Sequence, residues 1–189
     1  MKKSGLLLPI AAPSGTGKTT VCRELLAREP RCRFSISATT RPPRPNERDG
    51  VDYHFLSRSQ FEKYIREQRL AEYEEVFGNY YGTLQSSLEE ALQENLILLL
   101  DIDVKGALTI KRLYPDWTCS IFLLPPNRQE LLRRLRGRGT DDPATIELRN
   151  ARIPEELKHS EQFDYQIVND KLDDTVNRIL TIIKEYTHV

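Results

Sequence analysis

The stretch LLLPIAAPSGTGKTT, residues 6–20, decides the fold of this chain. Its first part, residues 6–11, is apolar and predicts a buried strand, whereas residues 18–29 have the pattern of a helix. Between them, two glycines and a lysine match the phosphate-binding pattern G-x-x-x-x-G-K-[ST], except that Ala12 replaces the first glycine. A methyl group is tolerated where the chain turns out of the strand, so we expect the loop to bind phosphate.

The loop carries the chemistry that a triphosphate needs. Backbone N–H groups between a strand and a helix are unpaired, and the helix N-terminus favours an anion. Gly15 and Gly17 allow a tight curl, Lys18 adds a positive charge, and the Thr19 hydroxyl can hold Mg²⁺. The predicted donor-phosphate site comprises Pro13, Ser14, Gly15, Thr16, Gly17, Lys18, Thr19 and Thr20. The alternative is a glycine-rich turn with a chance lysine, and phosphate binding alone does not separate a kinase from a GTPase or an ATPase motor.

A chain of 189 residues is long enough for one domain with a stable core. Its 28 basic and 28 acidic residues cancel, which argues against a general nucleic-acid or membrane binder. The three cysteines lack C-x-x-C spacing and the three histidines are scattered, so we expect reduced thiols and no zinc site. No apolar stretch reaches membrane-spanning length. We expect a cytoplasmic protein without nucleic-acid or membrane partners, and the sequence leaves the oligomeric state open.

Apolar runs that alternate with helical patterns predict an α/β fold with a mostly parallel sheet. Further strands are expected at residues 96–102, 120–124 and 165–168. Helices are expected at residues 172–186 and at residues 57–67, where Ser57 and Gln60 form a capping pair. Two excursions, residues 35–88 and 133–152, interrupt this rhythm without forming separate domains.

The first excursion contains a candidate second phosphate site. Arg41 and Arg44 flank prolines that stiffen their loop, and arginine forks match phosphate oxygens two at a time. Tyr53 and Tyr81 can each add a phenol donor. The alternative is a solvated arginine loop with two structural tyrosines.

Asp101 and Asp103 end the predicted strand at residues 96–102, at the sheet edge where ligands bind in open α/β folds. Strand alternation puts both on one face. One can hold Mg²⁺ through water, and the other can orient an arginine or the phosphoryl acceptor. The alternative, for Asp103 especially, is N-capping of a helix at residues 104–113, and both roles are compatible.

Three further blocks make the pattern specific. They are SISATTRPPRPNERDGVDYHF at residues 35–55, EEVFGNYYGT at residues 74–83 and LDIDVKG at residues 100–106. Together with the phosphate loop, they resemble the guanylate kinase family in order and spacing over nearly the whole chain. The resemblance implies a P-loop NTPase-type three-layer sandwich in which ATP, with Mg²⁺, phosphorylates GMP and also dGMP. It further implies a single domain with a core (1–34, 89–132 and 153–189), a small mixed α/β GMP-binding insertion (35–88) and a lid (133–152).

The resemblance also implies roles for individual residues. The GMP phosphate would be held by Arg41, Arg44, Tyr53 and Tyr81. The base would be read by Ser37, Glu72 and Thr83, with Asp101 nearest the acceptor nucleotide and Asp103 beside it. Arg134, Arg138 and Arg149 would be the catalytic lid arginines, acting with Lys18 and Asp101, and Asn169 would lie beside the donor adenine.

Physical chemistry agrees with the guanine assignment. Guanine presents two adjacent donors, N1–H and the 2-amino group, which one carboxylate such as Glu72 can accept together. Adenine would leave these buried groups unpaired, so such a site can discriminate by roughly 10⁴-fold or more. Without the resemblance, Glu72, Glu74 and Glu75 would be indistinguishable from a solvated acidic cluster.

No general base is needed, because a phosphate monoester is already largely ionised near neutral pH. Two positions depart from the family pattern. Asn46 replaces a common glycine and tolerates the left-handed conformation well, and Pro154 is expected to kink or split the helix after the lid. Two other functions remain open: a non-catalytic module of the same fold that binds protein partners, and a kinase for another phosphorylated acceptor.

Overall fold

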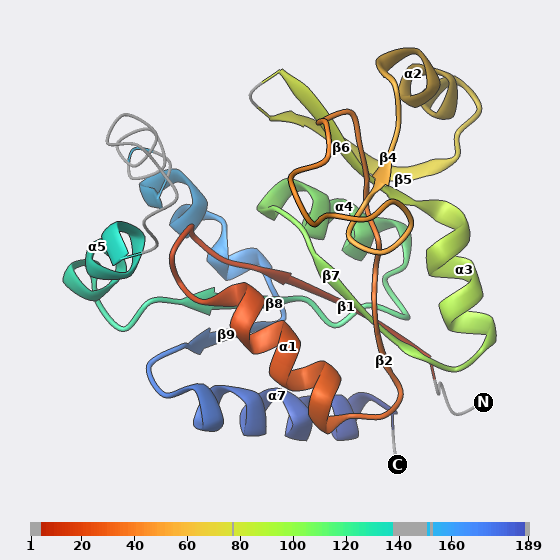
Figure 1. Ribbon diagram of the computed structural model, residues 1–189. Helices are drawn as coiled ribbons and strands as arrows, with labels where there is room; N and C mark the ends of the chain where they lie inside the picture. The colour runs from red at the N-terminus through yellow and green to blue at the C-terminus, as the bar shows by residue number, and fades with distance from the viewer. Residues whose placement is uncertain (1–4, 77, 138–150, 152, 188–189) are drawn as a thin grey trace.

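The computed structural model describes residues 5–76, 78–137, 151 and 153–187. At its centre lies a five-stranded sheet with the strand order β2-β7-β1-β8-β9 (Figure 1). The strands are β1 (Leu6–Ala11), β2 (Cys32–Phe34), β7 (Ile97–Asp101), β8 (Ile121–Leu124) and β9 (Tyr165–Val168). All four neighbouring pairs are parallel, so the carboxyl ends of the strands meet at one edge of the sheet.

Helices cover both faces of this sheet, which makes three layers (Figure 1). The helices α1 (Lys18–Arg28) and α7 (Leu172–Thr187) lie on one face, and α3 (Gln85–Gln93) and α4 (Val104–Leu113) on the other. Along β1, Leu6, Leu8 and Ile10 pack toward α1 and α7, whereas Leu7 packs toward α3 and α4. Burial on both faces explains why this strand is apolar at every position.

A second, mixed sheet with the order β4-β3-β6-β5 stands beside the core. It consists of β3 (Ala38–Thr39), β4 (His54–Phe55), β5 (Leu70–Val76) and β6 (Asn79–Leu84) and carries the helix α2 (Arg58–Arg66). Phe61 of α2 is fully buried and stacks on Tyr80 of β6 with ring centroids 5.2 Å apart. This small apolar cluster holds α2 on the sheet.

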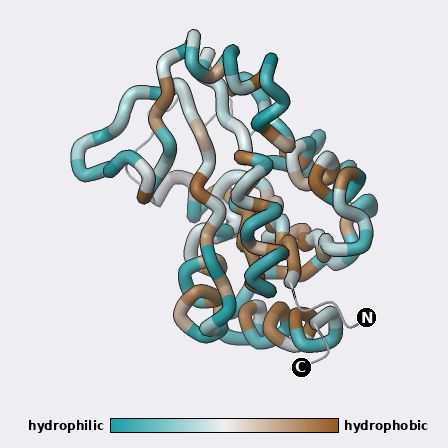
Figure 2. The backbone as a smooth tube through the Cα atoms, turned by 90° about the vertical axis from the view of Figure 1, so that its right-hand side faces the viewer, coloured by the Kyte–Doolittle hydropathy of each residue, from teal (hydrophilic) through white to brown (hydrophobic). Residues whose placement is uncertain are grey.

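Most elements agree with the sequence-based expectation. The strands predicted at residues 6–11 and 165–168 and the helix predicted at residues 104–113 have these bounds, and the other predicted strands and helices differ from the structure by one residue at one or both ends. The capping pair is also confirmed, because Ser57 accepts from the Gln60 backbone and Gln60 from the Ser57 backbone. In Figure 2, α7 alternates in colour along its length at the bottom of the molecule, as expected of an amphipathic helix.

Other features were not predicted. The edge strand β2 and the helix α3 have no counterpart in the expected elements, and α3 runs across the expected boundary between residues 88 and 89. The helix α5 (Arg128–Gly137) likewise runs across the boundary between residues 132 and 133. Local pattern therefore located the central strands better than the short edge strand β2 and the helix α3.

The structure describes both residues that depart from the family pattern, Asn46 and Pro154. Asn46 has a φ of 75°, so it adopts the left-handed conformation for which its side chain is suited. Pro154 lies within the helical residues 153–158, close to the end of the undescribed segment. None of the helices in the described ranges combines the length and apolar character that a bilayer crossing requires.

Candidate functional site

The phosphate loop joins β1 to α1 at the carboxyl edge of the central sheet. Gly15 and Gly17 have φ values of 91° and 99°, which glycine adopts without steric cost. Gly17 is the N-cap residue of α1 and has a left-handed backbone conformation. A Cβ atom at this position would lie 2.8 Å from the Asn169 side-chain nitrogen. The expected tight curl is therefore present although Ala12 replaces the first glycine, and Ala12 packs against the core beneath the loop.

Lys18 connects the loop to the end of β7. Its ammonium group lies 2.7 Å from Asp101 Oδ1 and donates to the Ile102 carbonyl at 2.8 Å. Thr19, next in the first turn of α1, is exposed. A cation and a hydroxyl thus stand together at the helix N-terminus, where phosphate groups bind favourably.

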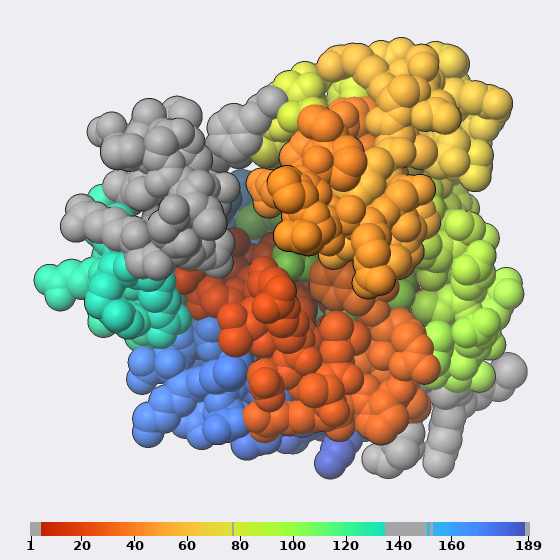
Figure 3. Space-filling model, in the orientation of Figure 1, coloured from red at the N-terminus to blue at the C-terminus, as the bar shows by residue number. Residues whose placement is uncertain are grey.

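One cavity of about 360 Å³ connects the loop with the insertion. Its wall includes Lys18 and Thr19 at one end and Ser37 and Glu72 at the other. Also lining it are Pro13, Ser14, Gly15, Gly17, Tyr53, Tyr81, Asp101 and Asp103. Figure 3 looks into the hollow between the orange insertion and the red loop. The structure therefore brings residues predicted for the donor and residues predicted for the acceptor to a shared space, although Arg41, Arg44 and Thr83 do not line it.

The far end of this cavity is built around Glu72. Thr83 Oγ1 donates to Glu72 Oε1 at 2.5 Å, and Thr83 is fully buried behind the carboxylate instead of lining the cavity. Burial raises the pKa of the Glu72 carboxyl, and the hydrogen bonds from Thr83 oppose that rise. In this arrangement the Thr83 hydroxyl orients an acceptor that faces the cavity.

Asp103 lies beside Glu72 and N-caps α4, because its Oδ1 accepts from the Gly106 backbone at 2.7 Å. Loss of solvation first, and then a hydrogen bond with Glu74, raise the pKa of Asp103 to about 7, although the residue stays partly open to solvent. Glu74 also pairs with Lys105 at 2.8 Å. The capping role expected for Asp103 is confirmed, and its carboxyl is also within the cavity wall.

The predicted acceptor-phosphate residues gather on the insertion. The Tyr53 and Tyr81 rings meet edge to face with centroids 6.2 Å apart, and the Arg41 guanidinium lies 5.4 Å from the Tyr53 ring centroid. Burial, and next the charge of Asp101, raise the pKa of Tyr53. Arg44 is exposed on the same loop and is not in the cavity wall. Asp101 therefore contacts Lys18, acts electrostatically on Tyr53 and lines the same cavity as both tyrosines.

Glu47, which the sequence did not single out, organises the arginine loop. Its Oε1 pairs with Arg41 at 2.8 Å, and its Oε2 accepts from the Arg44 backbone at 2.7 Å. These bonds lower the pKa of Glu47 below its usual value, with the Arg41 contact as the main cause. Glu47 lies within the block at residues 35–55 that carries the family resemblance, but its partners depend on how the loop folds.

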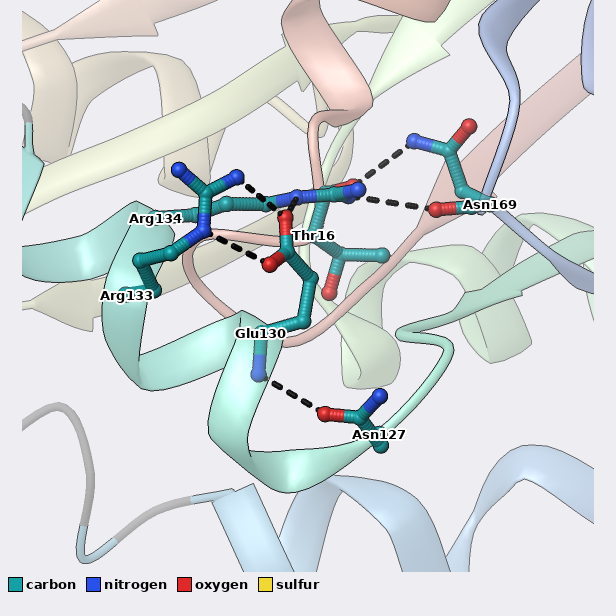
Figure 4. Close-up of polar contacts among 6 residues, drawn as sticks. All are labelled: Thr16, Asn127, Glu130, Arg133, Arg134 and Asn169. Atoms are coloured by element: carbon teal, nitrogen blue, oxygen red, sulfur yellow. Dashed lines mark hydrogen bonds and ion pairs between the residues drawn. The ribbon is translucent and has the colours of Figure 1, made fainter.

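Arg134 and Asn169 both bind the phosphate loop from behind (Figure 4). Asn169 is buried and donates from Nδ2 to the Thr16 carbonyl at 2.7 Å. Arg134 Nη1 donates to the carbonyls of Thr16 at 3.3 Å and Asn169 at 3.1 Å. These contacts fix the buried segment of the loop at Thr16. In this structure the two side chains therefore support the loop, whereas Arg138 and Arg149 lie outside the described residues.

Glu130 holds Arg134 in this position and was also missed by sequence reasoning. Its Oε1 accepts from Arg134 Nε and from Arg133 Nη2, both at 2.7 Å (Figure 4). Hydrogen bonds from Arg133 first, and then Arg134, lower the pKa of Glu130 to about 2. Arg133 points outward with 75% of its side chain exposed, as expected for a solvated helix face, whereas 24% of Arg134 is exposed.

This chain is similar in sequence to proteins of one known family. A family model described as guanylate kinase matches residues 5–186. The chain is 45% identical to the guanylate kinase of Chlorobium luteolum over 98% of this chain and 94% of that protein. It is 47% identical to the guanylate kinase of Chlorobaculum tepidum over 96% of this chain and 93% of that protein.

A solved structure supports the same relationship. The crystal structure of guanylate kinase from Anaplasma phagocytophilum superimposes with a TM-score of 0.81 at 32% identity, covering all of this chain and 89% of that one. Sequence and fold therefore agree over nearly the whole chain. The chain belongs to the guanylate kinase family.

Proposed function

We propose that this protein transfers the γ-phosphate of ATP to GMP, giving ADP and GDP, and that dGMP is a second acceptor. The observation that carries the proposal is the single cavity that has Lys18 at one end and Glu72 at the other. A triphosphate at the loop and a guanine at Glu72 would then point their phosphates toward each other across Asp101. Holding both reactants in this way removes most of the entropic barrier to transfer.

The acceptor end suits GMP. Glu72 presents a carboxylate to the cavity, Ser37 adds a hydroxyl, and Thr83 orients Glu72. We assign the acceptor phosphate to Arg41, Tyr53 and Tyr81, with Arg44 joining them from its exposed loop. The insertion is the acceptor-binding part of the molecule in this proposal, and residues 133–152 form the lid.

The donor end suits a triphosphate with Mg²⁺. We assign the phosphates to the loop residues 13–20 and the metal contact to the Thr19 hydroxyl, which lines the same cavity as Asp101 and Asp103. These hard oxygen donors fit Mg²⁺, which keeps several waters and binds mainly through one or two protein groups and the substrate phosphates. Within the described ranges, no cluster of three His, Cys, Asp or Glu side chains offers an all-protein metal site. When bound, Mg²⁺ neutralises phosphate charge.

The protein side of the transfer step is electrostatic. Lys18 would stay within reach of the transferred phosphoryl group while Asp101 and the Ile102 carbonyl fix its position. Arg134 lies behind the loop, and we assign it, together with Arg138 and Arg149, to the charge that develops during transfer. Asn169 keeps Thr16 in place next to the donor site. No side chain has to remove a proton from the acceptor.

A non-catalytic protein-binding module of the same fold is not favoured. Lys18, Thr19 and Glu72 all line one cavity, although protein binding requires none of them. A cytoplasmic location is part of the proposal as well, because Cys22, Cys32 and Cys119 are free thiols in the structure.

The experiment that tests the proposal measures ADP release from MgATP with GMP, dGMP, AMP, CMP or UMP as the acceptor. GMP should give the highest kcat/KM, dGMP should also react, and the other three should be slower by roughly 10⁴-fold or more. Absence of turnover with GMP would contradict the activity, and equal rates with AMP and GMP would contradict the guanine-reading role of Glu72.

Glu130→Gln is expected to lower kcat by about tenfold, because the neutral amide no longer holds the Arg134 guanidinium against the loop. The Asn127 cap on the Glu130 backbone is unaffected by this change, so the helix α5 should remain folded. Steady-state kinetics with saturating GMP and varied ATP measure the effect. Arg133→Ala is the matched control, since it removes the exposed partner of the same carboxylate. Equal loss in both variants would contradict a specific role for the Glu130–Arg134 pair.

A further inference from the structure

Gly106 lies inside α4, where glycine has no evident backbone function. It is the third residue of the helix, and glycine in a helix is less favourable than alanine by up to about 1 kcal/mol. Its φ is outside the left-handed region, so the backbone conformation does not demand glycine. Gly106 is also buried, one turn from the Asp103 cap. The atoms that surround Gly106 therefore explain why this position has no side chain.

The space that a side chain would fill is occupied by Glu72. A Cβ atom on Gly106 would lie 2.7 Å from Glu72 Oε2 and 3.1 Å from Glu72 Cδ, and 3.2 Å from Asp103 Oδ1. All three are side-chain atoms, and the first distance is shorter than real Cβ contacts. The Glu72 carboxylate thus rests on the backbone of the first turn of α4. The positive end of the helix dipole favours a carboxylate at this place.

The two oxygens of Glu72 are therefore fixed by different parts of the protein. Oε1 accepts from Thr83 on β6, and Oε2 is seated over Gly106 on α4. A methyl group at residue 106 would push Oε2 away and turn the carboxylate about its bond to Thr83. The carboxylate, which belongs to the cavity wall, would then present its oxygens to the acceptor in a different orientation.

We propose that Gly106 is a specificity-determining positioning residue, whose missing side chain seats the Glu72 carboxylate for bidentate recognition of guanine. The proposal rests on the proposed function and concerns the acceptor alone. Gly106 touches no substrate and acts through Glu72. Because the atoms that would have to move are the ends of two side chains, substitution by alanine should disturb recognition and leave the fold intact.

Gly106→Ala tests GMP recognition separately from folding, because it should weaken GMP binding without lowering the melting temperature. Higher helix propensity should leave the melting temperature unchanged or raise it. KM and Kd for GMP should rise by about tenfold or more, as expected when a buried acceptor loses its partner, while kcat stays within about threefold. Inosine monophosphate, which lacks the 2-amino group, should be affected less, so the GMP preference over this acceptor should fall.

Thr109→Ala is the matched control, because Thr109 lies one turn further along α4 and the change raises helix propensity without adding an atom beside Glu72. It should leave the KM for GMP and the preference over inosine monophosphate unchanged. A double-mutant cycle completes the test: in a Glu72→Gln background, Gly106→Ala should have no further effect on that preference.

Wild-type KM and wild-type preference in Gly106→Ala would overturn the inference, as would full additivity in the cycle. An unfolded variant would overturn it too, because the argument requires that only side-chain ends move. If the wild-type protein turns over GMP, these outcomes leave the proposed function standing. If the wild-type protein does not use GMP, the proposed function fails and the inference with it.

Discussion

Lys18→Ala is expected to lower kcat for GDP formation by roughly 10³-fold or more, the scale on which a single positive group stabilises phosphoryl transfer. Lys18 is the cation of the loop, and its ammonium lies at the cavity wall between Asp101 and the Ile102 carbonyl. Its removal leaves transition-state charge uncompensated at the donor end. The far end of the cavity is untouched, so Kd for GMP should stay within about threefold of the wild-type value.

The chain offers a matched control for this variant. Lys111 also pairs with an aspartate, Asp164 at 2.8 Å, and donates to a backbone carbonyl, that of Gln162 at 2.9 Å. It does not line the cavity. Lys111→Ala should therefore keep kcat near the wild-type value despite losing equivalent contacts. Activity in Lys18→Ala close to that of Lys111→Ala would show that the loop has been assigned wrongly.

Glu72→Gln is expected to reduce the preference for GMP over AMP by roughly 10²-fold or more. An amide retains one acceptor oxygen but presents N–H donors where guanine also presents donors, so two donors face each other. The remaining oxygen can still accept from Thr83, which keeps the buried hydroxyl satisfied. The ratio of kcat/KM for the two acceptors measures the change.

Glu75→Gln is the control on the same strand. Glu75 is exposed on β5, outside the cavity, and its carboxylate lies 3.8 Å from the Arg58 guanidinium. The preference for GMP should be unchanged in this variant. If Glu72→Gln and Glu75→Gln behaved alike, the acidic segment would be a solvated cluster and the base would be read elsewhere.

The sequence predicted the features that depend on local pattern. A strand buried on both faces is apolar throughout, as Leu6–Ala11 is, and a glycine-rich turn before a helix limits the possible conformations of the loop. The capping roles of Ser57 and Asp103 also follow from neighbouring residues. The left-handed conformation of Asn46 was expected on a different ground, because the family resemblance has a common glycine at this position and asparagine tolerates that conformation.

Features that depend on distant partners were missed. Glu130 sits on an exposed helix and its effect on the loop appears only when α5 lies against Thr16. Gly106 looks like an ordinary weak helix residue until Glu72, 34 positions earlier, is placed over it. The edge strand β2 is only three residues long and two of its residues are exposed, so it lacks the apolar signal of the central strands.

Transfer of the labelled γ-phosphate is the most direct test of the central claim. ATP labelled in its γ-phosphate is incubated with GMP, Mg²⁺ and the protein, and the label is followed in GDP and in inorganic phosphate. The structure predicts that the label enters the β-phosphate of GDP in equal amount to the ADP formed, with little in inorganic phosphate. Label that remains in ATP, or that leaves only as inorganic phosphate, would contradict a phosphotransferase that joins both nucleotides in one cavity.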